Sequence, residues 1–402
     1  MVVPSSASQN GPFSDAPQGD GALHVLMTDP HLRGGGQLTY VLRLAGEFLR
    51  LGHRVSIGCK AGSALASRAA DLGCHVHDCF IFKGGMRPRA WFHDVLEARR
   101  VILGKSPDII HVSGSQDHWV FAVANRLMGR PVCLVRTRHN TYPVKNNLPN
   151  RILNRAWTDF QIVVCETVRE TLAAHPAFDA ARMCAIHNGV DAEQYLPDPS
   201  VRARARAEFG FADSDVVCGI AARLTPAKGH AFLLEAAAAI REQFPNMRLL
   251  LLGQGELEEA LRRQAADLNI ADIVRFAGYR QDMQYCTQAF DIGVLPSIDC
   301  DTSSFSLKEE MAAEKPIIAS DYGGLKEIID DGVEGLIVPA GTVAPLAEAL
   351  GRLIGNPALR AAMGKRGRER VLAEFSMQTF AAKTLDAYRR AMEIHRERTA
   401  SR

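Results

Sequence analysis

Short, nearly continuous apolar runs separated by helix-length segments restrict the fold of this sequence more than any other feature. The runs over residues 247–255 and 291–296 lack the apolar–polar alternation of half-exposed strands. Such runs are typical of parallel strands that are buried on both faces of a sheet. The same strand–turn–helix order occurs in both halves, so the sequence predicts an α/β protein with two doubly wound parallel-sheet domains. The predicted strands occupy residues 24–29, 53–59, 75–82, 108–114, 131–139 and 159–166, and in the second half they begin at residues 216, 247, 273, 291, 315 and 335.

The size and composition of the chain agree with two ordinary domains. It has 402 residues, of which 47% are hydrophobic and 23% are charged. No apolar span reaches the roughly 20 residues of a membrane helix, so we expect none. Nine cysteines without a Cys-x-x-Cys pair indicate a reducing cytoplasm rather than a disulfide framework or a zinc site. Residues 1–21 lack the apolar core of a signal peptide, so we expect a disordered tail and no export.

Two acids, Asp301 and Glu309, flank a predicted loop-to-helix transition in the second half. The loop follows a predicted strand, so Asp301 is expected in the loop and Glu309 on the helix. A helix that begins at the carboxyl end of a parallel strand offers free backbone N–H groups, which suit a phosphate. The two carboxylates can then accept hydrogen bonds from hydroxyl groups on either side. The alternative is that the acids only cap the helix and keep the surface soluble.

A pair of cations, Arg223 and Lys228, follows another predicted strand, and Gly229 comes directly after them. Fixed Arg and Lys side chains can stabilise the negative charge that develops on a leaving diphosphate. Gly229 permits a close approach of the backbone. The alternative is that both side chains are simply solvated.

These motifs resemble those of glycosyltransferase family 4, the retaining nucleotide-sugar enzymes of the GT-B fold. Arg223, Lys228 and Gly229 match the family pattern Gly-Arg-Leu-x-x-x-Lys-Gly. The acid pair keeps the family spacing Glu-x7-Glu, with Asp301 in place of the first Glu. Residues 302–304, Thr-Ser-Ser, replace the usual Gly-Phe-Gly, and Phe appears at position 305.

The resemblance implies a role for each matching residue. Arg223 and Lys228 would neutralise the leaving diphosphate, and Glu309 would hold the ribose hydroxyls. Asp301 would hold the donor sugar, and His139 would position it. The remaining donor-binding candidates are Gly35, Gly36, Gly253, Arg280, Ser303, Ser304 and Phe305. The resemblance implies no required metal or other cofactor besides the nucleotide-diphosphate sugar.

Two further segments have open or structural interpretations. His111 is either a site residue or a histidine packed inside the sheet. Residues 186–191, Ile-His-Asn-Gly-Val-Asp, resemble a family segment that closes the first domain, and we interpret them as structural. The glycines at 34–36 lack the Gly-x-Gly-x-x-Gly spacing of a dinucleotide fingerprint.

The expected organisation is a tail over 1–21, an acceptor-binding domain over 22–195, a nucleotide-sugar-binding domain over 196–375, and a C-terminal helical segment over 376–402 that crosses back. The charged end of that segment, including His395 and Arg398, is expected to be solvated. The expected activity is transfer of a hexosyl or related group, with retention, from a nucleotide-diphosphate sugar to an acceptor hydroxyl. The alternatives are a GT-B-fold sugar-nucleotide epimerase, which needs acid/base residues in the cleft, and a catalytically weak nucleotide-sugar-binding protein.

Basic residues of the first half gather at 83–92 and 136–155, where aromatic and apolar residues are interleaved with them. We hypothesise a saccharide or lipid-linked acceptor with anionic character, or a peripheral contact with an acidic membrane surface. The alternative is a solvated surface. Motifs typical of nucleic-acid binding are missing, so no nucleic-acid partner is expected. These expectations fit a cytoplasmic enzyme, or one peripheral on the inner membrane face, in polysaccharide, lipopolysaccharide or glycolipid synthesis.

Overall fold

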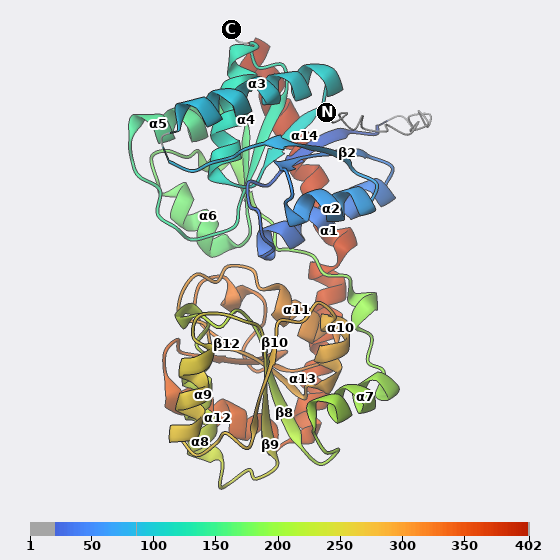
Figure 1. Ribbon diagram of the computed structural model, residues 1–402, viewed down its shortest axis with the longest axis vertical. Coiled ribbons are helices and arrows are strands. Elements are labelled where there is room, and N and C mark those ends of the chain that lie inside the picture. The colour runs from blue at the N-terminus through green and yellow to red at the C-terminus, as the bar shows by residue number, and fades with distance from the viewer. Residues whose placement is uncertain (1–20, 86, 401–402) are drawn as a thin grey trace, which may run out of the picture.

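The computed structural model describes residues 21–85 and 87–400 (Figure 1). These residues form two parallel β-sheets with helices packed around each, as the apolar runs predict. Residues 1–20 of the predicted tail and residues 401–402 of the predicted C-terminal segment lie outside the described residues.

The first sheet has seven strands in the order β3-β2-β1-β4-β5-β6-β7. Its strands are β1 (His24–Thr28), β2 (Arg54–Lys60), β3 (His75–Phe80), β4 (Ile109–Val112), β5 (Cys133–Arg138), β6 (Phe160–Val163) and β7 (Met183–Ala185). Its helices are α1 (Gly36–Arg50), α2 (Ala64–Asp71), α3 (Pro88–Lys105), α4 (Ser115–Leu127), α5 (Leu148–Arg151) and α6 (Glu166–Ala173).

The second sheet has six strands in the order β10-β9-β8-β11-β12-β13. Its strands are β8 (Val216–Ala221), β9 (Met247–Leu252), β10 (Val274–Gly278), β11 (Ile292–Leu295), β12 (Ile317–Ser320) and β13 (Gly335–Val338). Its helices are α7 (Pro199–Phe209), α8 (His230–Ile240), α9 (Glu258–Asp267), α10 (Met283–Cys286), α11 (Phe305–Ala312), α12 (Val343–Ile354) and α13 (Pro357–Arg370), with short turns η3 (Ala192–Tyr195), η4 (Pro226–Lys228) and η6 (Leu325–Glu327).

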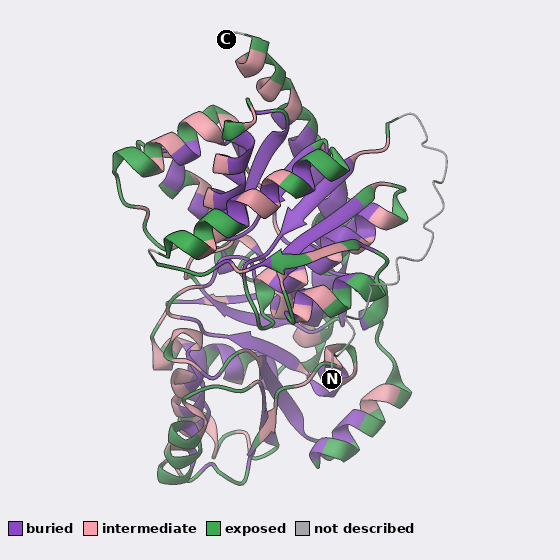
Figure 2. Ribbon diagram, turned by 45° about the horizontal axis from the view of Figure 1, so that its top comes forward, coloured by how far each residue is buried: buried purple, intermediate pink, exposed green. Residues whose placement is uncertain are grey.

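Burial on both faces explains why the strands read as continuous apolar runs. In β1, Val25 and Met27 belong to the apolar cluster that includes α1, whereas Leu26 belongs to the cluster on the other face, with residues of α3 and α4. All three side chains are fully buried. Figure 2 shows the same pattern, with buried strands inside and exposed residues on the outer helices. Successive side chains of a strand point to opposite faces, so both faces need apolar residues.

The final helix α14 (Met377–Ala400) extends from the second domain to the first (Figure 1). Its Phe380 packs so closely against Gly189 that a Cβ atom added there would lie 2.6 Å from the Phe380 Cβ. This contact supports the structural interpretation of residues 186–191. The expectation of a solvated C-terminal end is wrong for two residues, because His395 and Arg398 both contact the buried carboxylate of Asp159, each at 2.9 Å.

Among the described residues, none of the helices combines the length and the apolar character needed to cross a membrane.

Candidate active site

The predicted clamp residue Lys228 and the predicted sugar-binding residue Asp301 form an ion pair. The Lys228 Nζ donates to the Asp301 Oδ2 at 2.6 Å, and the Ser297 hydroxyl donates to the same oxygen at 2.7 Å. Lys228 ends the turn η4 after β8, and Asp301 lies in the loop between β11 and α11. The carboxyl ends of two neighbouring strands therefore bring the two motifs together.

Gly229 allows the turn that holds Lys228 to approach the loop that holds Asp301. Gly229 adopts φ +72°, and a Cβ atom there would lie 1.9 Å from the carbonyl oxygen of Pro296. The carbonyl of Ala227 in the same turn accepts a hydrogen bond from the amide of Ile298 at 2.9 Å. The η4 turn is thus pressed against the β11–α11 loop, and only a glycine fits at the contact.

Two further glycines support the same loop from the other side. Cβ atoms on Gly323 and Gly324 would lie 2.1 Å from the Asp301 carbonyl oxygen and 1.8 Å from that of Thr302. Between these supports Cys300 adopts φ +52°, a conformation that side-chain-bearing residues rarely take. Such local strain persists only where the surroundings fix the backbone, and it is common at functional sites.

Arg223, the other predicted clamp residue, is exposed at the end of β8. Its turn rests on Gly253, which adopts φ +144° and would place a Cβ atom 1.9 Å from the Ala222 carbonyl oxygen. The structure therefore gives Gly253 a role in placing Arg223, and direct donor binding by Gly253 stays a prediction. One clamp cation is free to meet a ligand, whereas the other is already paired.

Glu309 lies where the two domains meet. Arg43 of α1 donates to the Glu309 Oε1 at 2.5 Å and to the Gly189 carbonyl at 3.3 Å. The Arg43 guanidinium also lies over the Phe305 ring, 4.7 Å from its centroid. Sequence reasoning missed Arg43, because its partner is 266 residues away and nothing local marks the contact.

The hydroxyl groups of Ser303 and Ser304 are engaged within the protein. The Ser303 Oγ accepts from the Lys308 Nζ at 2.6 Å and from the Asn188 amide at 3.2 Å. The Ser304 Oγ accepts from the Leu307 amide at 3.3 Å and so caps α11. Donor binding by Ser303 and Ser304 stays a prediction, and a donor would have to compete with these internal hydrogen bonds.

Lys308 is a second residue that sequence reasoning missed. Its ammonium is fully buried and also donates to the Asn188 carbonyl at 3.0 Å, so it ties α11 to the segment between the domains. Burial lowers the pKa of Lys308 to about 7.

His139 follows β5 at the carboxyl edge of the first sheet. Its carbonyl accepts a hydrogen bond from the Thr302 hydroxyl at 3.1 Å, which brings it to the loop between β11 and α11 of the second domain, the predicted donor loop. Its ring meets Tyr40 edge-on at 4.6 Å, and its Nε2 is buried without a hydrogen-bond partner among the described residues. Burial lowers the pKa of His139 to about 3, so the imidazole is neutral at physiological pH and can bind a hydroxyl.

The open question about His111 is answered by its surroundings. The side chain is fully buried, with Nδ1 2.5 Å from the Tyr388 hydroxyl and Nε2 2.6 Å from the Thr137 hydroxyl. His111 is thus a hydrogen-bonded core residue that helps to anchor α14.

The other donor-binding candidates differ in their surroundings. Gly35 and Gly36 are exposed at the beginning of α1, and a Cβ atom on either would have nothing within 4 Å, so the space beside them is open. Arg280 is held by three short contacts, at 2.6 Å to Glu208 and at 2.8 and 2.7 Å to Asp282. A donor contact by Arg280 would have to compete with these two carboxylates.

Glu327 of η6 joins the domains at a further point. Its carboxylate accepts hydrogen bonds from the amides of Glu166 and Thr167 at 2.7 and 2.8 Å, so it caps α6 of the first domain. The Thr167 hydroxyl donates to it at 2.7 Å, and the His187 Nε2 lies 3.2 Å away. Burial alone would raise the pKa of Glu327, but these hydrogen bonds lower it to about 2.

The basic segment at 136–155 is only in part the surface that the sequence indicated, because Lys145, Arg151 and Arg155 are exposed but two other cations are not. Arg136 and Arg138 are buried, with Arg136 donating to the His118 Nδ1 at 2.7 Å and Arg138 to the Tyr142 carbonyl at 2.5 Å. Both belong to the interior because they lie in β5. The segment at 83–92 does reach the surface. Its exposed members are Lys83, Arg87, Arg89, Trp91 and Phe92.

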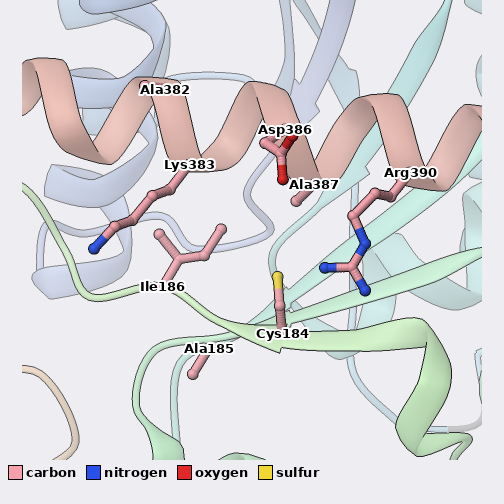
Figure 3. Close-up of a pocket in the computed structure, with 8 residues that line it drawn as sticks. All are labelled: Cys184, Ala185, Ile186, Ala382, Lys383, Asp386, Ala387 and Arg390. Carbon is pink, nitrogen blue, oxygen red and sulfur yellow. The ribbon is translucent and has the colours of Figure 1, made fainter.

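A shallow cleft of about 360 Å³ lies between β7 and α14 (Figure 3). Lys383, Asp386 and Arg390 of α14 line one side of it, and Cys184, Ala185 and Ile186 line the other. The lining residues include none of the predicted site residues.

Comparison with known proteins gives two adjoining family matches. The family described as "Glycosyltransferase Family 4" matches residues 34–194, and the family described as "Glycosyl transferases group 1" matches residues 201–370. The division between the matches lies between β7 and β8, where the two sheets divide.

Several curated proteins are similar in sequence. The D-inositol 3-phosphate glycosyltransferase of Saccharomonospora viridis is 30% identical over 400 residues, which cover 90% of each chain. The putative glycosyltransferase EpsD of Bacillus subtilis is 32% identical over 63% of this chain and 65% of its own length. A GDP-mannose-dependent phosphatidylinositol monomannoside mannosyltransferase of Mycolicibacterium smegmatis is 32% identical over 48% of this chain and 53% of its own. The chain thus spans less than two thirds of the last two relatives.

Solved structures show the same fold. A glycosyltransferase from Rickettsia africae superimposes with a TM-score of 0.84 at 19% identity, over 92% of this chain and 99% of that one. Anabaena Alr3699/HepE in complex with UDP superimposes with a TM-score of 0.80 at 20% identity, over 90% and 99% of the two chains. The arrangement of two parallel-sheet domains is therefore that of the GT-B glycosyltransferases.

Proposed function

Because this chain belongs to glycosyltransferase family 4 and has the GT-B fold, we propose that it transfers a sugar from a nucleotide-diphosphate donor to an acceptor hydroxyl with retention at the anomeric carbon. The predicted domain roles follow, with the donor bound by residues 196–375 and the acceptor received by residues 22–195.

The contact between Lys228 and Asp301 carries this proposal. In the structure the Asp301 carboxylate lies 2.6 Å from the Lys228 ammonium and neutralises it. A diphosphate brings more negative charge and would take over Lys228 together with the exposed Arg223. Asp301 would then be free to accept hydrogen bonds from the sugar hydroxyls. When Lys228 exchanges Asp301 for the diphosphate, both the diphosphate and the sugar of the donor thus gain a binding group.

The same geometry suggests how the reaction proceeds. The bond between the anomeric carbon and the diphosphate oxygen breaks while the acceptor oxygen bonds to that carbon from the same face. The acceptor proton passes to the departing diphosphate, whose charge Arg223 and Lys228 stabilise. The neutral His139, across from the donor loop, would hold a sugar hydroxyl.

Glu309 would bind the ribose hydroxyls, as the family pattern implies. Its Oε1 is occupied by Arg43 in the structure. The ribose must therefore share the carboxylate with Arg43 or displace it, so donor binding is linked to a contact between the domains.

The acceptor belongs to polysaccharide, lipopolysaccharide or glycolipid synthesis in our proposal. Two relatives are named for action on D-inositol 3-phosphate and on a phosphatidylinositol mannoside, and these names support an acceptor of this kind. The side chains of Trp91 and Phe92 are 42% and 60% exposed beside the exposed Lys83, Arg87 and Arg89. Aromatic and basic side chains together suit an acidic membrane surface. Sedimentation with vesicles of phosphatidylcholine and phosphatidylglycerol should show binding that Trp91→Ala plus Phe92→Ala reduces, and equal binding by that variant would contradict the contact.

The activity itself is tested by incubating the protein with labelled UDP-, GDP- and ADP-sugars, with and without candidate acceptors. We expect one donor to be consumed in an acceptor-dependent manner. Conversion of a donor alone to an epimer would favour the epimerase alternative. Binding of a donor without any turnover would favour the catalytically weak binding protein.

A further inference from the structure

Basic side chains follow three neighbouring strands of the first sheet, at the carboxyl edge. His31 and Arg33 come after β1, Lys60 ends β2, and Lys83 comes after β3. The order β3-β2-β1 makes these strands adjacent, and all of them are parallel, so their carboxyl ends lie together. His31, Arg33 and Lys83 are exposed, and Lys60 is half-buried.

The acids at the ends of β1 and β4 are buried and already bonded. The Asp29 Oδ1 lies 2.6 Å from the His31 Nδ1 and accepts from the Gln37 amide group at 3.0 Å. Asp117 accepts from the Thr28 hydroxyl at 2.6 Å and from backbone amides. Asp78 is exposed, but it lies within β3, two residues before the strand ends. The exposed charges beyond the ends of these strands are therefore positive.

Asp29 fixes the imidazole of His31. The Asp29 side chain is 1% exposed, whereas the His31 side chain is 59% exposed. Because Nδ1 is bonded to Asp29, Nε2 is the ring nitrogen left for a ligand. The hydrogen bond that His31 donates to the Asp29 carboxylate raises the pKa of His31, which favours the protonated ring that would attract an anion.

Backbone contacts hold the His31 loop and the Lys60 turn in fixed positions. The Ala64 amide at the beginning of α2 donates to the Leu32 carbonyl at 3.2 Å, and the Ser63 amide donates to the Lys60 carbonyl at 3.2 Å. The charge of Lys60 also acts on the His31 imidazole. On the other side, a Cβ atom on Gly84 would lie 3.2 Å from the Gln116 Nε2, so the Lys83 loop overlies the same edge.

Buried polar atoms without partners lie along this edge between the cations and the donor loop. Among the described residues these atoms include the Asp29 Oδ2, the Ser113 Oγ and the His139 Nε2. The Asp29 and Ser113 residues are 0% and 4% exposed. They follow β1, β4 and β5, which are consecutive strands of the sheet. Buried polar groups in proteins nearly always have a partner, so a ligand with hydroxyl groups is a natural one here.

We propose that His31, Lys60 and Lys83 bind a phosphate group of the acceptor, while the hydroxyl-bearing part of the acceptor extends along β1 and β4 toward His139. This inference rests on the proposed function, because His139 marks the reacting end only if the donor sugar lies beside it. His31 and Lys60 lie at the ends of β1 and β2, which are two and three strand spacings of about 4.8 Å from β5, so the phosphate and the reacting hydroxyl would be roughly 10–14 Å apart. That span suits a phosphorylated sugar or polyol.

Titration calorimetry of the full-length protein with inorganic phosphate and with glycerol 3-phosphate tests the site. Two double variants are compared, His31→Asn with Lys60→Met at the acceptor edge and Arg223→Ala with Lys228→Ala at the clamp. Because the clamp can itself bind a phosphate, His31→Asn and Lys60→Met are also introduced together into the clamp variant. There we expect them to weaken the remaining phosphate binding by about tenfold or more, because charge-assisted hydrogen bonds are lost. Binding of UDP, GDP or ADP should require the clamp residues and should not require His31 and Lys60.

The controls separate this inference from the proposed function. The single variant Lys60→Arg keeps His31 and the positive charge at position 60, so it should bind phosphate as the wild type does. Circular dichroism checks that every variant is folded. Phosphate binding lost only in the clamp variant, or undetectable in the wild type, would overturn the proposal. If no nucleotide binds while phosphate still requires His31 and Lys60, the proposed function fails but the phosphate site stands.

A vesicle arm identifies the source of the phosphate. Protein is sedimented with phosphatidylcholine vesicles that contain phosphatidylglycerol. Loss of sedimentation in the His31/Lys60 variant assigns the phosphate to a lipid headgroup, and unchanged sedimentation assigns it to a soluble acceptor.

Discussion

The polar side chains at the carboxyl edges of the two sheets differ in whether they already have partners. At the edge of the second sheet, Lys228 and Asp301 are paired with each other. At the edge of the first sheet, the Ser113 Oγ and the His139 Nε2 are buried without partners among the described residues. In our proposal the second sheet has the donor edge, where a ligand must replace an existing partner, and the first sheet has the acceptor edge, where a ligand supplies a partner that is missing. Recognition of a common donor group can thus be built into a short motif, while recognition of the acceptor depends on residues that the fold collects.

The largest expected effect comes from removing the clamp ammonium. Lys228→Ala should lower turnover by about 10²–10³, because the charge on the leaving diphosphate loses a fixed donor. The measurement is the initial rate with the sugar nucleotide that the wild type consumes. Lys326→Ala is the matched control, since Lys326 is exposed on η6, and it should keep the wild-type rate. A normal rate in Lys228→Ala would rule out the clamp.

Asp301→Asn should separate catalysis from diphosphate binding. Turnover should fall by about tenfold or more, because a charge-assisted hydrogen bond to the sugar is weakened. Affinity for the product diphosphate should stay the same or increase, since the carboxylate that competes for Lys228 is gone. Product-inhibition kinetics measure both quantities. Weaker inhibition by the diphosphate in this variant would contradict the exchange of partners.

Glu327→Gln tests the contact that holds the two edges opposite each other. Removing the charge from a helix cap should lower the free energy of unfolding by about 1–2 kcal/mol, as measured by urea denaturation at pH 7. Glu374→Gln, in which a 52% exposed side chain is changed, should alter stability by less than about 0.5 kcal/mol.

The same contact predicts a pH dependence. The pKa of Glu327 is lowered from its ordinary 4.5 to about 2, so its stabilising effect is complete above 4.5 and is lost as the pH falls toward 2. The difference in stability between wild type and Glu327→Gln should therefore shrink over that window. A difference that is constant from pH 6 to pH 2.5 would show that the charge of Glu327 is not what matters.

The smallest expected effect is that of Arg43→Met. The variant loses the contact to Glu309, but it also removes the group with which the ribose must compete. With the Arg43 side chain 25% exposed, we expect a loss of stability of about 1 kcal/mol or less and a change in kcat/KM of no more than about fivefold. Thermal denaturation and steady-state kinetics check the two numbers, and a hundredfold loss of activity would mean that Arg43 contacts the donor directly.

Features that depend on residues near one another in the chain could be predicted from the sequence. The strands follow from local apolar runs, and the clamp and acid pair follow from short motifs in which Gly229 and the glycines at 323–324 mark close backbone contacts. Those features depend on neighbours in the chain. To predict the ion pair of Lys228 with Asp301, one would have needed only the additional knowledge that β8 and β11 are adjacent strands.

Contacts between distant segments could not be predicted in this way. Arg43, Lys308 and Glu327 act across the domains, on partners whose positions depend on the complete fold. Arg136 and Arg138 were wrongly counted in a basic surface, because a count of charges does not reveal that an arginine lies in a buried strand. The sequence also gave no sign that His31 belongs to a group of cations. Lys60 and Lys83 are far from it in the chain, and only the strand order places them at the same edge.

Calorimetric titration of UDP, GDP and ADP into the wild type, Lys228→Ala and Asp301→Asn tests the exchange of partners at the donor edge most directly. We predict that one diphosphate binds the wild type, that Lys228→Ala weakens this binding by about tenfold or more, and that Asp301→Asn does not weaken it. Equal weakening in both variants, or no binding of any diphosphate to the wild type, would contradict the account.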